Sequence, residues 1–173
     1  TTFIFLVTFI FLLNFSSFNS DTFGYQEYVF VQNWARNNYT HKISEIHDVL
    51  ATKDFVFVPD YENHNIKKFT KNGTFVLEWG MEGTDPGQFD TPHSMDVDSK
   101  GFVYVSDMNN KRIQKFDSNG SFIVEWGIAG EGAGEFLHPH GIAIDSNNDV
   151  YVADTEITDI QKFTKDGQFI RKW

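Results

Sequence analysis

The chain has 173 residues and a net charge of −10, from 24 acidic and 14 basic side chains. This length suits one domain with a real core, and the negative field repels phosphate backbones, so nucleic acid is excluded as a partner. There is no cysteine, which excludes a disulfide framework and a thiolate metal site. Aromatic residues make up 17% of the chain, and Phe alone supplies 19, a composition that favours an all-β fold.

The chain starts with an apolar segment. Residues 3–13 are apolar except for Thr8, and a polar stretch follows. This length matches the hydrophobic part of a signal peptide better than the roughly 20 residues of a membrane-spanning helix. We expect residues 1–19 to be a signal peptide or a membrane anchor. The protein would then be extracellular or membrane-anchored, facing outside, and would meet the membrane only through this segment.

Residues 20–45 carry Tyr, Asn and Gln without a regular pattern, which predicts a linker or an irregular first strand. The remainder repeats every 47 residues. This spacing separates Trp79, Trp126 and Trp173, and it also separates three copies each of Ile66, Phe69, Gly73 and Asp60. A fixed period in this range indicates a repeat architecture.

Each copy of the repeat predicts a series of hairpins. Strand patterns such as 103–107 and 112–116 are separated by polar turns, and Asn-Gly or Asp-Gly pairs at 72–73, 119–120 and 166–167 predict type I′ turns. With the strand at 93–97, each copy has four strands, which is typical of a β-propeller blade. We predict an all-β propeller with three four-stranded blades, at about 46–89, 90–136 and 137–173.

The repeats resemble the NHL-repeat family of β-propellers. The resemblance covers about residues 46–173 and rests on GMEGTDPGQFDTPHSMDV at 80–97, VYVSDMNNKRIQKF at 103–116 and GEFLHPHGIAIDSNNDVYVAD at 134–154. NHL-type propellers usually have six blades. Three blades therefore imply that the others lie beyond this sequence or, if the chain is complete, that a homo-oligomer supplies them.

Histidines are the main candidates for chemistry. His93 and His140 share one repeat position, directly after Pro92 and Pro139, and His47 falls one residue outside that register. Neutral imidazoles from several blades that converge on one axis can hold a divalent metal such as zinc. The alternative is a turn variant without any cofactor, in which each imidazole bonds a backbone carbonyl.

Residues 56–94 resemble the peptidyl-α-hydroxyglycine amidating lyases (peptidylamidoglycolate lyases), which are NHL-type enzymes. These hold zinc with three channel histidines beside a Tyr and Arg residues. The resemblance implies Tyr61 as the catalytic Tyr, after a one-residue deletion, and His93 as a zinc ligand. Two features depart from the family. Met108 stands where the lyases have an Arg, and the histidines come from consecutive blades instead of alternate ones.

The remaining polar residues predict structural roles. Asp60, Asp107 and Asp154 are expected to cap turns, because a catalytic residue would not recur in every blade. The propeller lactonases, which hold calcium with Glu, Asn and Asp, are a further enzyme class to which no motif here points, and a structural calcium stays an open alternative. A solvated face is expected from the basic residues of the third strands, namely Lys67, Lys68, Lys111, Arg112, Lys115 and Lys162.

Two functions from different classes follow. The first is an exported propeller that binds a protein or a small-molecule ligand at one end of the ring and needs no metal. The second is a zinc-dependent lyase for peptidyl-α-hydroxyglycine, with His93, His140 and His47 as metal ligands and Tyr61 as the general base. Stoichiometric zinc separates the two hypotheses.

Overall fold

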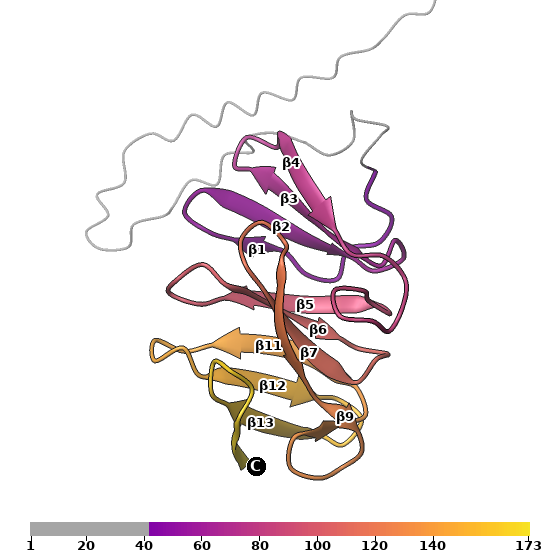
Figure 1. The fold of residues 1–173 in the computed structure, drawn as a ribbon, viewed down its shortest axis with the longest axis vertical. Helices are drawn as coiled ribbons and strands as arrows, with labels where there is room; N and C mark the ends of the chain where they lie inside the picture. The colour runs from indigo at the N-terminus through magenta and orange to yellow at the C-terminus, as the bar shows by residue number, and fades with distance from the viewer. Residues whose placement is uncertain (1–41) are drawn as a thin grey trace, which may run out of the picture. The chain divides into compact units, whose positions relative to one another are not determined.

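A computed structural model describes residues 42–173, so the predicted export segment 1–19 and most of the predicted linker lie outside the described residues. The described part contains strands and turns, arranged in three four-stranded antiparallel sheets and one short two-stranded sheet. Figure 1 shows the three large sheets stacked in chain order. Within residues 42–173, no helix has the length and apolar character to cross a membrane.

The large sheets follow the 47-residue repeat. The first contains β1 (Leu50–Ala51), β2 (Phe55–Asp60), β3 (Asn65–Thr70) and β4 (Phe75–Trp79). The second contains β5 (Pro92–Val97), β6 (Val103–Asp107), β7 (Arg112–Phe116) and β8 (Phe122–Trp126). The third contains β11 (Pro139–Ile144), β12 (Val150–Asp154), β13 (Asp159–Phe163) and β14 (Phe169–Lys172). Between the last two, β9 (Ile128–Ala129) pairs in parallel with β10 (Glu135–Phe136).

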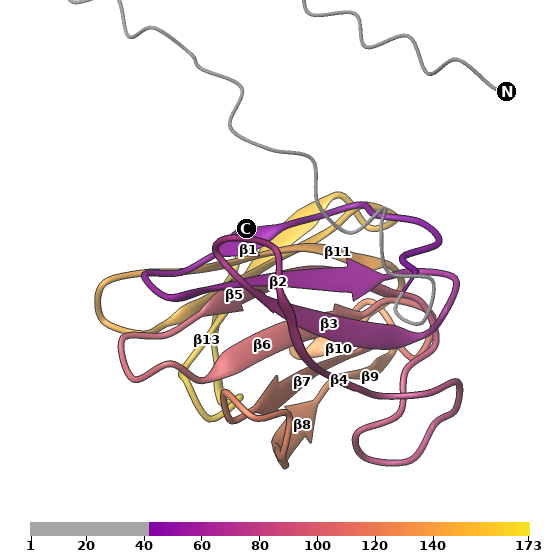
Figure 2. The same cartoon turned by 90° about the horizontal axis from the view of Figure 1, so that it is seen from above.

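Within each sheet, neighbouring strands are also neighbours in sequence. The first strand of the second sheet, β5, lies against β1 and β2 of the first sheet and against β11, the first strand of the third. In the view from above, β4 and β8 lie on the opposite side from β1 and β11 (Figure 2). We call the first strand of each sheet, namely β1, β5 and β11, its inner strand. The inner strands of successive sheets lie side by side.

The hydrophobic core lies between neighbouring sheets. One cluster joins the first two sheets, and it contains Phe57, Ile66, Phe89, Met95, Val103, Val105 and Phe116. A second cluster joins the next pair, and it contains Tyr104, Ile113, Phe136, Val150, Val152 and Phe163. Phe89 and Phe136 precede the inner strands and are fully buried. Burial of such rings is the main favourable term that holds one sheet on the next.

Trp79 and Trp126 each link their own sheet to the following one. The Trp79 ring centroid lies 5.9 Å from that of Phe116 in the second sheet. The hairpin glycine of that sheet lies against the same indole, because a Cβ added to Gly120 would stand 2.7 Å from Trp79. Trp126 and Gly167 repeat the arrangement at the next junction. The 47-residue spacing of Trp and Gly is therefore a packing requirement.

The hairpin turns differ from the prediction. Type I′ turns need positive φ at both central residues, but in these pairs only the glycines have it, for example 81° at Gly73. The N–H of Gly73 donates to the Thr70 carbonyl, and the N–H of Thr70 donates to the Thr74 carbonyl. The register shifts between Lys68 and Phe69. The loop is thus a longer turn with a left-handed glycine and a bulge, and the I′ prediction was wrong because it assumed a two-residue loop.

The prediction of a solvated basic face is also wrong for four of its six residues. Lys67 Nζ donates to Asp60 Oδ2 at 2.9 Å, and Arg112 Nε donates to Asp107 Oδ2 at 2.7 Å. Loops between the sheets cover these strands, so their polar side chains satisfy carboxylates and loop carbonyls instead of water. The exposed fractions are 2% for Lys67, 3% for Lys68, 6% for Arg112 and 4% for Lys115.

The repeated aspartates connect the end of each second strand to the chain that enters the sheet. Asp107 accepts the N–H of Asp90 at 2.8 Å, and Asp60 accepts the N–H of Ser44 at 3.2 Å. Asp154 accepts main-chain N–H groups in the same way in the third sheet. Ser44 belongs to the predicted linker 20–45, so this part of that segment bonds to the first sheet.

Candidate functional site

The residues predicted as a site lie at one end of the sheets. His93 is the second residue of β5, and His140 is the second residue of β11. His47 precedes β1, and Tyr61 directly follows β2. The start of an inner strand pairs with the end of the second strand in each sheet, as β5 and β6 show. The strand register alone therefore gathers these side chains at one end.

The rings of all four residues lie close together. The His93 and His140 ring centroids are 3.6 Å apart, with 39° between the planes. The His47 ring lies between Tyr61, at 4.7 Å, and His93, at 4.8 Å. The Tyr61 and His93 rings meet edge to face at 6.4 Å. One continuous aromatic cluster results, although His47 stands one residue outside the repeat register.

His138 adds a fifth ring that the sequence analysis did not single out. Its ring centroid lies 6.0 Å from that of His140, and its Nδ1 lies 3.1 Å from the Thr155 hydroxyl. The other copies carry Thr91 and Ser44 at this position, so the repeat gave no signal. The only hint was the string His-Pro-His. We call the five residues the histidine end, namely His47, Tyr61, His93, His138 and His140.

Burial keeps the central imidazole neutral. His93 is 7% exposed, and its Nδ1 is buried without a hydrogen-bond partner. Burial, followed by the neighbouring His140 and His47, lowers the pKa of His93 to about 4. Burial and the nearby His138 and His47 also lower the pKa of His140. At neutral pH these imidazoles are therefore uncharged, and each keeps one acceptor nitrogen.

A polar layer behind the rings holds the inner strands in place. Asp48 Oδ2 accepts the Ser94 hydroxyl at 2.8 Å and the N–H of Met95 at 3.0 Å, which ties the first sheet to the second. The fully buried Ser106 hydroxyl donates toward the His140 carbonyl at 3.1 Å, which ties the second sheet to the third. These bonds fix the main chain beside His93 and His140, so the rings meet in a defined geometry.

The imidazoles of the histidine end provide the donor atoms that a zinc ion needs, but not the arrangement. Three imidazoles and an orphaned Nδ1 are chemically suited to zinc. Across residues 42–173, however, no three His, Cys, Asp or Glu side chains are arranged to hold a metal ion. The His93 and His140 rings pack against each other at a tilt of 39°, and His47 Nε2 lies 2.8 Å from Glu45 Oε1. The arrangement fits neither the predicted zinc nor a calcium site, and Met108 is a buried apolar residue.

Residues 98–173 match the sequence family described as 6-bladed beta-propeller. No curated protein sequence matches the chain. Solved structures show the same architecture at low identity. A streptogramin B lyase has 19% identity and a TM-score of 0.57, with 72% of this chain and 39% of that one covered. The described sheets are blades of a β-propeller.

Two further structures agree. A Bacteroides fragilis NCTC 9343 protein, described only provisionally as exported, has 15% identity and a TM-score of 0.63, with coverage of 81% and 40%. A catalytically inactive virginiamycin B lyase from Staphylococcus aureus, crystallised with quinupristin, has 18% identity and a TM-score of 0.57, with coverage of 77% and 43%. The chain thus spans 39% to 43% of these structures, which matches three blades of a six-bladed ring.

Proposed function

We propose that this protein is an exported β-propeller that binds a protein or a small molecule at the histidine end, without a metal. The observation that carries this proposal is the continuous ring cluster in which Tyr61 contacts His47 and His93, and His93 contacts His140. These close-packed rings, of which His93 and His140 are uncharged, offer apolar faces together with hydrogen-bonding nitrogens and a phenol group. Such a surface suits a planar or amide-rich ligand.

The wider comparisons support a binding role on this scaffold. One propeller of the same fold was crystallised with quinupristin, and another is described provisionally as exported. The motifs around 80–97 and 134–154 further favour blades of the NHL type. Because a fold hosts many functions, the site and not the architecture carries the proposal.

Arrays of peptides and small molecules, probed with the purified full chain, test the proposal. We expect a set of hits that bind the wild type and are lost in the His93→Ala, His140→Ala double variant. Lys53→Ala is the matched control, because Lys53 lies near the start of β2, away from Tyr61 at its other end. If the double variant loses none of the hits, binding lies elsewhere and the proposal is refuted.

A zinc-dependent peptidyl-α-hydroxyglycine lyase is the second candidate. One observation favours it, since Tyr61 lies beside two of the three predicted ligands, His47 and His93. The direct packing of the His93 and His140 rings and the Met at position 108, where the lyases have an Arg, count against it. The test is release of glyoxylate from a peptidyl-α-hydroxyglycine by the full chain supplied with zinc. Turnover that is lost in Tyr61→Phe would favour the lyase over the binding module.

A further inference from the structure

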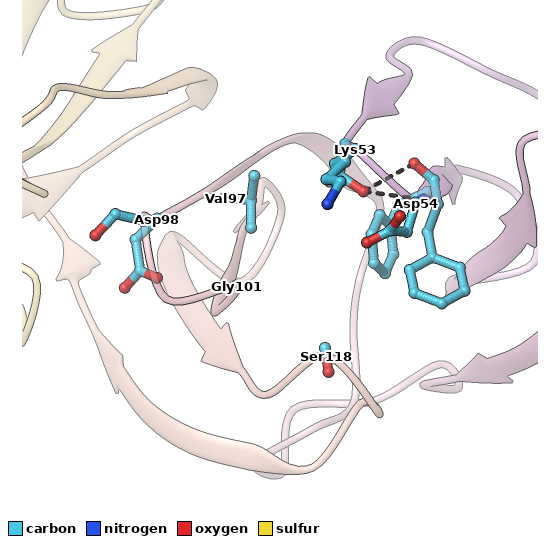
Figure 3. A pocket seen from close by; sticks show the side chains of 10 residues that line it. Lys53, Asp54, Val97, Asp98, Gly101 and Ser118 are labelled. Carbon is cyan, nitrogen blue, oxygen red and sulfur yellow. Dashed lines mark hydrogen bonds between the residues drawn. The ribbon is translucent and has the colours of Figure 1, made fainter.

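A pocket opens between the first and second sheets, at the end opposite the histidine end (Figure 3). Its volume is about 360 Å³, within the range of small-molecule sites. Phe55 and Phe57 at the start of β2 form one wall, and the segment from Val97 to Gly101 after β5 forms another, with Ser118 from the second sheet's hairpin. In the close view, Lys53 and Asp54 lie across the pocket from Val97 and Gly101.

The junction between the second and third sheets has side chains where the first junction has the pocket. Between the second and third sheets, the Tyr104 hydroxyl lies 3.0 Å from Asp98 Oδ2 and 3.1 Å from the Lys165 carbonyl. One repeat earlier, Tyr104 corresponds to Phe57 and Asp98 corresponds to Ala51. The first junction therefore lacks both the hydroxyl and the carboxylate.

A loop contact is missing in the same place. Between the second and third sheets, Asn148 Oδ1 accepts the N–H of Ser99 at 2.8 Å and joins the two loops. The residue one repeat before Asn148 is Gly101, which has no side chain to reach the loop at 52–54. Three small or apolar residues, Ala51, Phe57 and Gly101, thus create the pocket where a filled junction would otherwise occur.

The same substitutions leave a buried ammonium group with few partners. Lys68 is 3% exposed, donates to the Ser118 carbonyl at 2.6 Å and lies 4.0 Å from the ring centroid of Phe55. Both of these neighbours line the pocket. The equivalent Lys115 has two carboxylates within 4.0 Å, whereas the charge of Asp117 acts on Lys68 without forming an ion pair within that distance.

A buried cation with one acceptor favours an anionic ligand, because an ammonium group has three donors and its charge is poorly hydrated there. We propose that this pocket binds a small organic carboxylate whose aromatic body lies against Phe55 and Phe57 and whose carboxylate pairs with Lys68. The ligand supplies the negative charge that Asp98 supplies to Lys115 at the next junction. Burial lowers the pKa of Lys68, although the charge of Asp117 opposes this, so a carboxylate bound beside the ammonium group would raise that pKa again.

The test is a titration of the full chain with benzoate, followed by NMR, with benzyl alcohol as the uncharged comparison. We expect saturable benzoate binding that weakens by about tenfold or more in Lys68→Met, while benzyl alcohol binding changes little. Lys162→Met is the matched control, because Lys162 occupies the same repeat position but pairs with Asp149 at 2.7 Å. It should bind benzoate as the wild type does.

A second variant separates loss of the pocket from loss of the fold. Gly101→Asn should close the pocket and abolish benzoate binding, yet remain folded. Nothing lies within 4 Å of the added Cβ, and Asn148 already holds this repeat position at a φ of 65°. Absence of saturable binding by the wild type, or unchanged affinity in both Lys68→Met and Gly101→Asn, would overturn the proposal. His93→Ala should have no effect, which keeps this test independent of the histidine end.

Discussion

The hairpin glycines provide a sharp test of how the blades pack. Gly120→Ala would place a methyl carbon 2.7 Å from Cγ and Cδ2 of Trp79, well inside the about 3.5–4.0 Å of a normal carbon contact. The indole has little room to move away. Its ring lies edge to face on Phe57, at 6.2 Å, and tilted on Phe116, at 5.9 Å. The added methyl group must therefore strain the junction between two blades.

The cost has two parts. At a φ of 83°, alanine in place of Gly120 costs about 1–2 kcal/mol through its left-handed backbone. Overpacking against Trp79 adds about 1–3 kcal/mol. Gly101→Ala isolates the first part, because its φ is 85° and nothing lies within 4 Å of its added Cβ. The difference between the variants, about 1–3 kcal/mol, measures the contact with the indole.

Urea denaturation of the full chain, followed by circular dichroism, gives both free energies of unfolding. Gly120→Ala should lose more stability than Gly101→Ala. Gly167→Ala should behave like Gly120→Ala, because its added Cβ would also stand 2.7 Å from an indole, that of Trp126. Equal losses in all three variants would show that only backbone conformation matters, and the packing argument would fail.

Two further predictions concern buried polar groups. Tyr104→Phe removes a fully buried hydroxyl that shares its one hydrogen between Asp98 Oδ2 and the Lys165 carbonyl, and it should cost about 1–2 kcal/mol in the same denaturation assay, so a variant as stable as the wild type would contradict the network. Burial raises the pKa of Asp60, but hydrogen bonds from Asn63 and Lys67 outweigh it and lower the pKa overall. This stabilisation is present above roughly pH 4 and is lost as the pH falls further, so the Tm difference between wild type and Asp60→Asn should shrink in acid. A difference that stays constant between neutral and acid pH would refute the Asp60 contribution.

The 47-residue repeat made the architecture predictable because the repeated residues pack against one another. Trp79 contacts Gly120 across the junction between two blades, so both residue types recur with the same period. Turn type and burial were harder to predict. An Asn-Gly pair does not reveal the length of its loop, and the sequence of β7 does not show that other loops cover Arg112 and Lys115.

The histidine end was predicted in part. His93 and His140 share a repeat position, and the structure places His47 and Tyr61 beside them. His138 was missed because the other copies do not carry histidine there. How the nitrogens point depends on main-chain bonds such as the one from Ser106, which no local pattern reveals.

The pocket could not be predicted from a motif, because it arises where residues are smaller than their counterparts. Phe57 in place of a tyrosine and Gly101 in place of an asparagine look unremarkable in the sequence. Only the filled junction around Tyr104 shows what they omit.

The central claim is that the histidine end binds its ligand through imidazole and phenol rings and not through a metal. Elemental analysis of the purified full chain, beside the His93→Ala, His140→Ala double variant, tests this most directly. The account predicts far less than stoichiometric zinc in both proteins. About one zinc per chain in the wild type that is lost in the variant, together with glyoxylate release, would contradict it and establish the lyase.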